Sequence, residues 1–396
     1  MKIDGVRLGV AQAGIKKPAF DDLTLIELAA GTVTVGVFTQ NAFCAAPVML
    51  AKSHLQASHN RPAYWLVNTG NANAGTGEKG MQAARASCHT VAATAGVAID
   101  TVMPFSTGVI GELLPVSKIQ AAIPAAFDAL HADGWQRASV AILTTDTKPK
   151  LVSRQFDIDG ARVRITGMAK GAGMLCPNMA TMLAFIATDA CIHQSVLNKA
   201  FRYAVDASFN RITVDGDTST NDAAVIAATG QGPVIISDET LLSYQQFQDQ
   251  LTELCIDLAQ GLVRDGEGAT KFVTVDVQGG MTTQESDAVA YTIAHSPLVK
   301  TALFAGDPNW GRLLAAIGRA GLAGLVVEDI SVFINNVLIA ERGARADSYS
   351  EEQGADAMAG EDIIIRVELN RGGANTTLWT SDLSYEYVRI NAEYRT

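Results

Sequence analysis

A loop gives way to an apolar strand in the stretch Lys170-Gly-Ala-Gly-Met-Leu-Cys-Pro-Asn-Met-Ala-Thr181-Met-Leu-Ala-Phe-Ile-Ala-Thr-Asp189. Pro177 and Asn178 predict a turn, because Pro fixes φ and Asn tolerates turn geometry. The β-branched and aromatic residues from Thr181 to Thr188 predict a buried strand with Thr181 at its first position. Junctions of this kind are most often ordinary entries into a core strand, and this interpretation stays open.

The Ala180–Thr181 junction also has the composition of a nucleophile that the chain makes for itself. A threonine hydroxyl is a weak nucleophile at its own pKa. A chain break before Thr181 would free an α-amine next to that hydroxyl, and this amine could act as its base. The reference pKa of an α-amine, about 7.7–8.0, suits a base near neutral pH. The junction therefore predicts either an N-terminal threonine nucleophile or a plain loop.

Length and charge limit the class of protein. The chain has 396 residues, of which 48% are hydrophobic and 18% charged. This exceeds the size at which single hydrophobic cores stop growing, so we expect two lobes. The formal net charge of −11 argues against binding to nucleic acid phosphates or to an anionic membrane. Small-molecule substrates are favoured as partners.

The start of the chain and its cysteines favour the cytoplasm. Residues 1–7 lack the long apolar core of a secretory signal, and no apolar run is long enough to span a membrane. The five cysteines are odd in number and form no C-x-x-C pair, as expected for reduced thiols. Cys176 lies in the same loop as Thr181, but no base for a catalytic thiol is evident. The six histidines share no ligand spacing, so we expect no metal and no cofactor.

Apolar periodicity predicts a mixed α and β architecture. Helices are expected from about Met81, over residues 194–209 and over residues 243–263. Strands are expected over residues 63–68, 330–339, 363–369 and 376–390. This pattern alone does not distinguish an α+β fold from a doubly wound parallel sheet.

The segment centred on Asn178-Met-Ala-Thr-Met-Leu183 resembles the self-cleavage signature of the ornithine acetyltransferase family, the glutamate N-acetyltransferases of arginine biosynthesis. Further motifs follow the order of that family along nearly the whole chain: Gln12-Ala-Gly-Ile-Lys-Lys17, Val67-Asn-Thr-Gly-Asn-Ala-Asn-Ala-Gly75, Met103-Pro-Phe-Ser-Thr-Gly-Val-Ile110, Thr144-Thr-Asp-Thr147, Ile212-Thr-Val-Asp-Gly-Asp-Thr-Ser-Thr-Asn-Asp222, Arg264-Asp-Gly-Glu-Gly-Ala-Thr-Lys271 and Asp307-Pro-Asn-Trp-Gly-Arg312. Several ordered motifs are far more specific than one short motif. Cys176 departs from the pattern, since many members carry another residue there, often His.

The resemblance implies a large α+β arrangement with sheets packed between helical layers. It also implies self-cleavage between Ala180 and Thr181. The products would be an α chain of residues 1–180 and a β chain of residues 181–396 that fold together as one unit. Two α and two β chains are expected to form a heterotetramer.

The resemblance gives roles to residues whose own composition left more than one interpretation open. Ser106-Thr107-Gly108 reads as a tight turn, and the family assigns an oxyanion hole to Thr107 and Gly108. Lys170 could be a solvated loop lysine, a fragment of a phosphate loop, or a point charge for a substrate carboxylate, and the family favours the last.

The remaining substrate contacts also come from the resemblance. Glu267 lies between glycines and could be a solvated turn residue, and the family gives it to a substrate ammonium. Family position adds Thr144, Asn391, Thr396 and Thr181 itself. The assignment of Thr396 depends on the chain end folding back over the pocket, since chain ends are usually frayed.

The implied activity is transfer of acetyl from N-acetylornithine to glutamate through an acetyl-threonine. Acetyl-CoA as a second donor stays open, because no basic cluster for its phosphates is evident. Two other functions stay open as well. An N-terminal-nucleophile aminopeptidase or amidohydrolase would use the same cut and pass the acyl group to water. A non-catalytic protein would instead hold a small anion in its Gly/Asn loops.

Overall fold

The computed structural model describes residues 1–16, 19–176 and 182–394. It divides into two compact units. Unit 1 consists of Met1–Asn210 and Asp217–Leu262, and unit 2 of Arg211–Gly216 and Val263–Thr396. The predicted two lobes and mixed α and β composition are confirmed. Ala180, Thr181 and Thr396 lie outside the described residues.

Unit 1 contains two main sheets. The four-stranded sheet has the order β1-β2-β4-β5, formed by Val6–Ala11, Leu23–Leu28, Tyr64–Asn71 and Val102–Val109. The five-stranded sheet has the order β3-β11-β8-β7-β6, formed by Val33–Phe38, Ala223–Ala228, Leu183–Thr188, Ala161–Lys170 and Lys150–Ile158. A small sheet pairs β9 (Cys191–Ile192) with β12 (Ile235–Ile236). Every residue of β8 and β11 is buried, which makes these parallel neighbours the centre of their sheet.

Helices cover the outer faces of both sheets, so the predicted layering is confirmed. The helices of unit 1 are α1 (Ala46–Ala57), α2 (Gly77–Ala95), α3 (Val116–Asp128), α4 (Trp135–Ala141), α5 (Gln194–Ala207) and α6 (Leu242–Arg264). Apolar residues of α2 and α3 form one core with the four-stranded sheet. Leu254 and Leu258 of α6 pack closely over Gly167 of β7. Between the sheets, the Phe185 ring lies 5.0 Å from that of Phe105 and 5.9 Å from that of Trp65, centroid to centroid.

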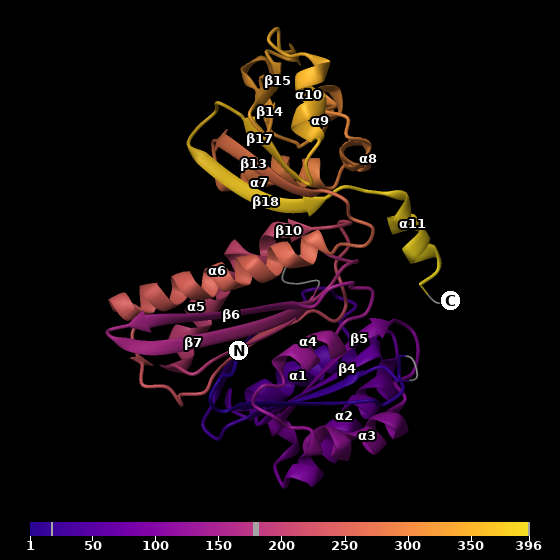
Figure 1. Ribbon diagram of the computed structural model, residues 1–396, viewed down its shortest axis with the longest axis vertical. Coiled ribbons are helices and arrows are strands. Elements are labelled where there is room, and N and C mark those ends of the chain that lie inside the picture. The colour runs from indigo at the N-terminus through magenta and orange to yellow at the C-terminus, as the bar shows by residue number, and fades with distance from the viewer. Residues whose placement is uncertain (17–18, 177–181, 395–396) are drawn as a thin grey trace. The chain divides into compact units, whose positions relative to one another are not determined.

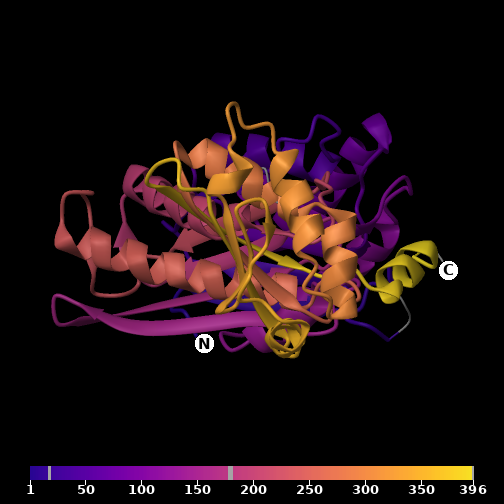
Figure 2. The ribbon, with the colours of Figure 1, turned by 90° about the horizontal axis from the view of Figure 1, so that it is seen from above.

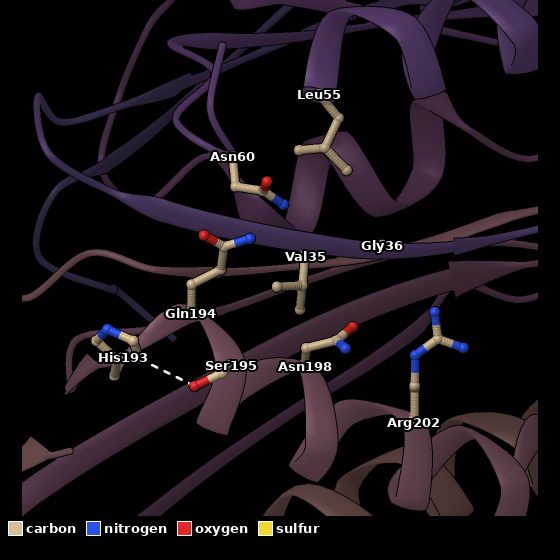
Figure 3. A pocket seen from close by; sticks show the side chains of 9 residues that line it. All are labelled: Val35, Gly36, Leu55, Asn60, His193, Gln194, Ser195, Asn198 and Arg202. Atoms are coloured by element: carbon tan, nitrogen blue, oxygen red, sulfur yellow. Dashed lines mark hydrogen bonds between the residues drawn. The ribbon is translucent and has the colours of Figure 1, made fainter. Parts of the chain in front are cut away.

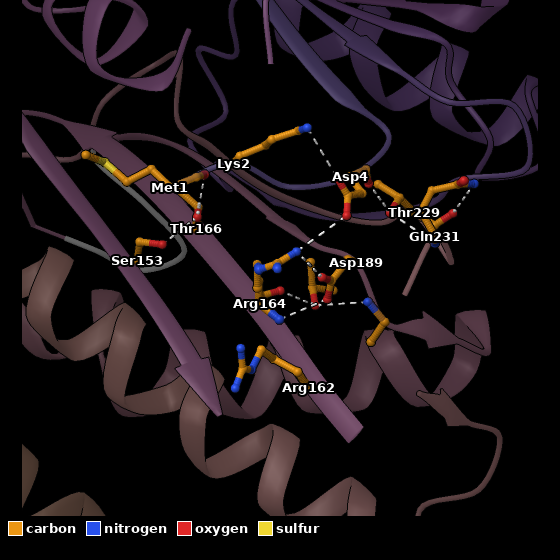
Figure 4. A network of polar contacts seen from close by, with 12 residues as sticks. Met1, Lys2, Asp4, Ser153, Arg162, Arg164, Thr166, Asp189, Thr229 and Gln231 are labelled. Atoms are coloured by element: carbon orange, nitrogen blue, oxygen red, sulfur yellow. Dashed lines mark hydrogen bonds and ion pairs between the residues drawn. The ribbon is translucent and has the colours of Figure 1, made fainter. Parts of the chain in front are cut away.

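The long β6–β7 hairpin runs beside α6 (Figures 1 and 2). Arg154 on β6 holds the two together, because its guanidinium bonds Glu253 at 2.8 Å and Asp257 at 2.6 Å. The chain start lies against β7, where the Thr166 hydroxyl donates to the Met1 carbonyl at 3.0 Å (Figure 4). Arg164 and Asp189 continue this polar network.

Unit 2 is built on a seven-stranded sheet with the order β10-β18-β13-β17-β14-β15-β16. Its strands are β10 (Ile212–Thr213), β13 (Phe272–Gly280), β14 (Ser331–Ile334), β15 (Val337–Glu341), β16 (Ala344–Arg345), β17 (Asp362–Glu368) and β18 (Ala374–Ser381). Its helices are α7 (Thr283–Ala294), α8 (Pro297–Ala305), α9 (Trp310–Gly318), α10 (Glu351–Met358) and α11 (Tyr385–Ala392). The first four helices contribute to a single apolar core with the sheet.

The predicted strand over residues 376–390 is wrong in its second half. Strand β18 ends at Ser381, and α11 follows. Ser384 starts that helix, because its hydroxyl accepts the N–H of Glu386 at 3.2 Å, as an N-cap does. Two helix boundaries also differ: α2 begins at Gly77 rather than Met81, and α5 ends at Ala207 rather than at Phe209.

The described ranges contain no helix that is both long and apolar enough to cross a membrane. Within the same ranges, no group of three or more His, Cys, Asp or Glu side chains could hold a metal ion.

All five cysteines are free thiols. Burial raises the pKa of the Cys88 and Cys255 thiols far above the usual range, so these two are unreactive core residues.

We predict that Phe185→Ala destabilises unit 1 by about 3–5 kcal/mol, because it removes a ring that fills the space between the two sheets. Urea unfolding followed by circular dichroism measures this loss. Tyr203→Ala is the matched control, since Tyr203 is 56% exposed on α5 and should change stability by less than about 0.5 kcal/mol. Equal losses in both variants would contradict the packing of the Phe185 ring between the two sheets.

Candidate active site

Lys170, the last residue of β7, brings three predicted site residues of unit 1 together. Its ammonium donates to the Thr144 hydroxyl at 2.6 Å and to the Thr107 hydroxyl at 3.2 Å. Its side chain is buried, so it is not the solvated loop lysine that the sequence left open. An ammonium is only a donor, so both hydroxyl oxygens accept from it and keep their own hydrogens for another acceptor. Lys170 thus orients two O–H donors.

Asp146 compensates the charge of Lys170, and sequence reasoning did not single it out. Its carboxylate lies 3.6 Å from the Lys170 ammonium and 2.5 Å from that of Lys150. It also accepts the N–H groups of Gly171 at 2.7 Å and Thr144 at 3.1 Å. Burial alone would raise the pKa of Asp146, but the two lysines and the Gly171 N–H outweigh it and hold that pKa well below its usual range. Asp146 is therefore an anion that fixes the loop before β6 and the loop after β7.

Thr107 and Gly108 lie in strand β5, not in a turn as the sequence suggested. Strands β4 and β5 are parallel, and their register shifts between Gly70 and Asn71, opposite this point. Gly108 has φ of +131°, and a Cβ there would lie 2.2 Å from the carbonyl carbon of Gly70. Only glycine allows this close approach. The bulge interrupts regular pairing beside Thr107, which is a common arrangement near active sites.

Asn221 holds β5 in this position. Its side-chain amide donates to the Ser106 carbonyl at 3.0 Å and to the Ala72 carbonyl at 2.6 Å. It lies within the motif Ile212–Asp222 that the sequence marked without giving its members a role. The signal available in the sequence was the run of polar residues directly before the apolar residues of β11. The asparagines of the Val67–Gly75 motif bond the backbone in a similar way, as in the 2.8 Å bond from the Asn68 side-chain amide to the Asn71 carbonyl.

Glu267 and Asn391 belong to unit 2 and contact each other there. The Asn391 amide donates to the Glu267 carboxylate at 2.7 Å, and α11 carries Asn391. Glu267 is only 8% exposed, so it is not the solvated turn residue that its glycine neighbours suggested. The described structure thus places the predicted residues in two groups, one in each unit.

A separate cavity of about 510 Å³ lies in unit 1 at the start of α5 (Figure 3). It contains none of the predicted site residues. His193 Nδ1 lies 3.0 Å from the Ser195 hydroxyl there, and both side chains are exposed. This contact belongs to the first turn of a helix, and we assign it no chemistry.

Two hydroxyl donors on one buried lysine, Thr107 from β5 and Thr144 from the loop before β6, are groups that suit acyl transfer. The profile of the ArgJ family matches residues 7–396. The arginine biosynthesis bifunctional protein ArgJ of Pseudomonas syringae pv. tomato is 54% identical over 396 residues, which cover 100% of this chain and 97% of that protein. The protein of the same name from Methylococcus capsulatus is 52% identical over 394 residues, which cover 100% and 96%.

A solved structure agrees with these relatives. The crystal structure of the arginine biosynthesis bifunctional protein ArgJ from Bacillus halodurans is 39% identical, with a TM-score of 0.51, and covers 54% of this chain and 100% of that chain. The chain belongs to the ArgJ family. The family predicted from the sequence motifs is confirmed, and with it an acetyltransferase of arginine biosynthesis.

We predict that Asp146→Asn destabilises unit 1 by about 3–5 kcal/mol at pH 7, because two buried lysines lose their counter-ion. The folded-state pKa of Asp146 is lowered, so its contribution is present above the unfolded-state pKa of about 3.9 and is lost as the pH falls below it. The gap between variant and wild type should therefore shrink below about pH 4. Denaturant unfolding across pH measures this gap.

The control for this prediction is Asp157→Asn, whose carboxylate is 69% exposed in a 4.0 Å pair with Arg162. It should change stability by less than about 0.5 kcal/mol. A gap for Asp146→Asn that stays constant down to pH 2 would show that its charge is not what stabilises the site.

Proposed function

We propose that the protein transfers acetyl from N-acetylornithine to glutamate after cutting its own chain between Ala180 and Thr181. The observation that carries this proposal is the buried Lys170 ammonium, which orients the hydroxyls of Thr107 and Thr144 from the end of β7. The Thr107 hydroxyl suits an oxygen that becomes negative during attack on a carbonyl, and the Thr144 hydroxyl suits a substrate carboxylate. The family to which the chain belongs supports the same chemistry.

In maturation, the Thr181 hydroxyl attacks the Ala180 carbonyl and the oxyanion is held at Thr107 and Gly108. The bond from the Ala180 carbonyl to the Thr181 nitrogen breaks, and that nitrogen takes a proton. The product is an ester on Thr181, which water hydrolyses to the free carboxylate of Ala180 and the free hydroxyl. The α chain is then residues 1–180 and the β chain residues 181–396.

Turnover repeats the chemistry with the new α-amine as base. The hydroxyl attacks the acetyl carbonyl of N-acetylornithine, ornithine leaves with the proton on its amine, and an acetyl-threonine remains. The amine of glutamate then attacks this ester and takes the acetyl group. Lys170 and Thr144 fit a role at the substrate carboxylate, whereas Glu267 with Asn391 fits the ornithine ammonium. Thr396 and Thr181 complete the set that the family resemblance gives.

Sheet pairing supports the idea that the two products stay together. Strand β7 belongs to the predicted α chain and β8 to the predicted β chain, and they pair along six residues from Ile165 opposite Thr188 to Lys170 opposite Leu183. A cut at 180 leaves these hydrogen bonds intact. We propose a heterotetramer of two α and two β chains in the cytoplasm, with no metal or other cofactor.

Two alternatives are distinguished by products. An aminopeptidase or amidohydrolase with the same nucleophile would release acetate or a cleaved peptide without glutamate. A non-catalytic anion-binding protein would remain uncut and form no acyl-enzyme.

We predict that purified wild-type protein consists of two fragments, the second beginning Thr181-Met-Leu, and that Thr181→Ala stays whole and inactive. The alanine lacks the attacking hydroxyl, while Thr181→Ser keeps one and should cut. Intact mass spectrometry reads the result directly. Cys176→Ala is the control from the same loop and should cut normally, because the mechanism gives its thiol no role. A cut Thr181→Ala protein would exclude this nucleophile.

We predict that N-acetylornithine is a better acetyl donor than acetyl-CoA, as no basic cluster for the CoA phosphates is evident in the sequence. Glu267→Gln should raise KM for N-acetylornithine about tenfold or more and leave KM for acetyl-CoA nearly unchanged, because only the former presents an ammonium. Steady-state kinetics with glutamate as acceptor and each donor in turn measures both values. Equal effects on the two donors would remove Glu267 from ammonium recognition.

A further inference from the structure

The proposed self-cleavage leaves one proton transfer without a group to perform it. After the cut, the α-amine of Thr181 serves as base. Before the cut, the same nitrogen is an amide and has no basic lone pair. Some other group must take the proton of the Thr181 hydroxyl and supply a proton to the departing nitrogen. The inference below rests on the proposed self-cleavage.

Asp222 lies directly beside the residue that follows Thr181. Strands β11 and β8 pair in parallel from Ala223 opposite Leu183, and the Ala223 N–H donates to the Met182 carbonyl at 3.1 Å. Asp222 therefore stands next to Met182, whose backbone N–H hydrogen-bonds the Asp222 carboxyl group. Met182 follows Thr181 directly in the sequence. The strand pairing thus sets the Asp222 carboxyl beside the residue that directly follows the proposed junction.

The Asp222 side chain is a buried carboxyl group with an open position. It is 2% exposed, and no donor among the described residues reaches its Oδ2 atom. Burial raises its pKa well above the usual range, although Ser219, Lys170 and the Met182 N–H act in the opposite direction. The titratable groups that interact with it across the described residues are Lys170 on β7 and the Cys44 thiol. Burial therefore favours the protonated, neutral form of the Asp222 carboxyl group.

Lys170 thus interacts with two carboxyl groups whose pKa values are shifted in opposite directions. Asp146 is held as an anion by two ammonium groups and backbone donors, whereas burial raises the pKa of Asp222 and favours its protonated form. A pair of acids whose environments separate their pKa values marks the division of acid and base roles in a site. The Asp146 carboxylate fixes Lys170, and the protonated form of Asp222 carries a proton that can move.

We propose that Asp222 is the proton relay of self-cleavage. One oxygen of its carboxyl group accepts the proton of the Thr181 hydroxyl as Oγ bonds to the Ala180 carbonyl carbon. The other oxygen gives its proton to the Thr181 nitrogen as the bond from carbon to nitrogen breaks. One proton arrives and one leaves, so the carboxyl group ends neutral, and the products are the ester and the amine. A protonated carboxyl can donate and accept at once, whereas a carboxylate can only accept.

The test is Asp222→Asn, which keeps the shape and the lack of charge but cannot relay a proton. Self-cleavage, followed by intact mass after synthesis, should slow by about 100-fold or more. Molecules that have been cut should retain kcat within about tenfold of wild type, since the free α-amine then serves as base. If Asp222 had only a structural role, its substitution would lower the rate of self-cleavage, kcat and the melting temperature together.

Stability provides the independent readout. The raised pKa means that the folded protein binds more protons than the unfolded chain above about pH 4, so wild type loses stability as the pH rises through that range. An asparagine side chain does not titrate, so the Asp222→Asn protein does not lose stability in this way as the pH rises. The melting temperature of Asp222→Asn should therefore equal or exceed that of wild type at pH 7, with an advantage that disappears toward pH 4. A lower melting temperature at pH 7 would overturn the proposal.

Asp189→Asn is the matched control, a buried acid at the opposite end of β8 that bonds the Arg164 N–H at 2.9 Å (Figure 4). Its self-cleavage should stay within about twofold of wild type. Cleavage of Asp222→Asn at the wild-type rate, or equal slowing in both variants, would overturn the relay. An uncut wild type would instead overturn the proposed self-cleavage itself, so the two failures are distinct.

Discussion

The burial of the Lys170 ammonium is the constraint on which the rest of the site depends. A buried charge is expensive unless it is paired and fully hydrogen-bonded. Asp146 supplies the pairing charge, and the hydroxyls of Thr107 and Thr144 take the remaining donors. These partners come from β5 and from the loop before β6, so satisfying one lysine brings both segments to the end of β7. Pairing and hydrogen-bonding the Lys170 ammonium therefore stabilises this region of unit 1 and also orients the hydroxyl groups of Thr107 and Thr144.

The central sheet of unit 1 explains how a chain can be cut at a strand end without losing its fold. Strand β8 follows the junction and is buried along its whole length between β7 and β11. Its hydrogen bonds to β7, and the contacts of Phe185 with Trp65 and Phe105, join residues on the C-terminal side of the junction to residues on its N-terminal side. Chain continuity through residue 180 adds little to such packing. The same parallel pairing sets Asp222 beside Met182, so the strand that anchors the junction also brings a carboxyl group to it.

Apolar periodicity predicted the long helices and strands well. It failed where a helix cap or strand pairing overrides what the composition of a segment suggests. Helix α6 and strand β17 were expected within a residue or two of their bounds, because their apolar spacing persists over their full length. The end of the chain was misassigned, since β-branched and aromatic residues up to Ile390 suggested a strand, whereas the Ser384 cap begins a helix. Thr107 was expected in a turn because Pro104 and Gly108 are typical of turns. Pairing with β4 instead keeps them in a strand.

The sequence by itself determined the family, and it marked the threonine junction and most of the side chains proposed to carry the chemistry, because these are matters of residue identity and order. It also marked the Thr144–Thr147 and Ile212–Asp222 motifs without separating their members by role. Only the tertiary structure decided that the pKa of Asp146 is lowered and that of Asp222 is raised. Both are aspartates in short polar segments, and nothing in their neighbours along the chain distinguishes them. Their pKa values depend on burial and on which charges lie within a few ångströms, and folding alone sets both.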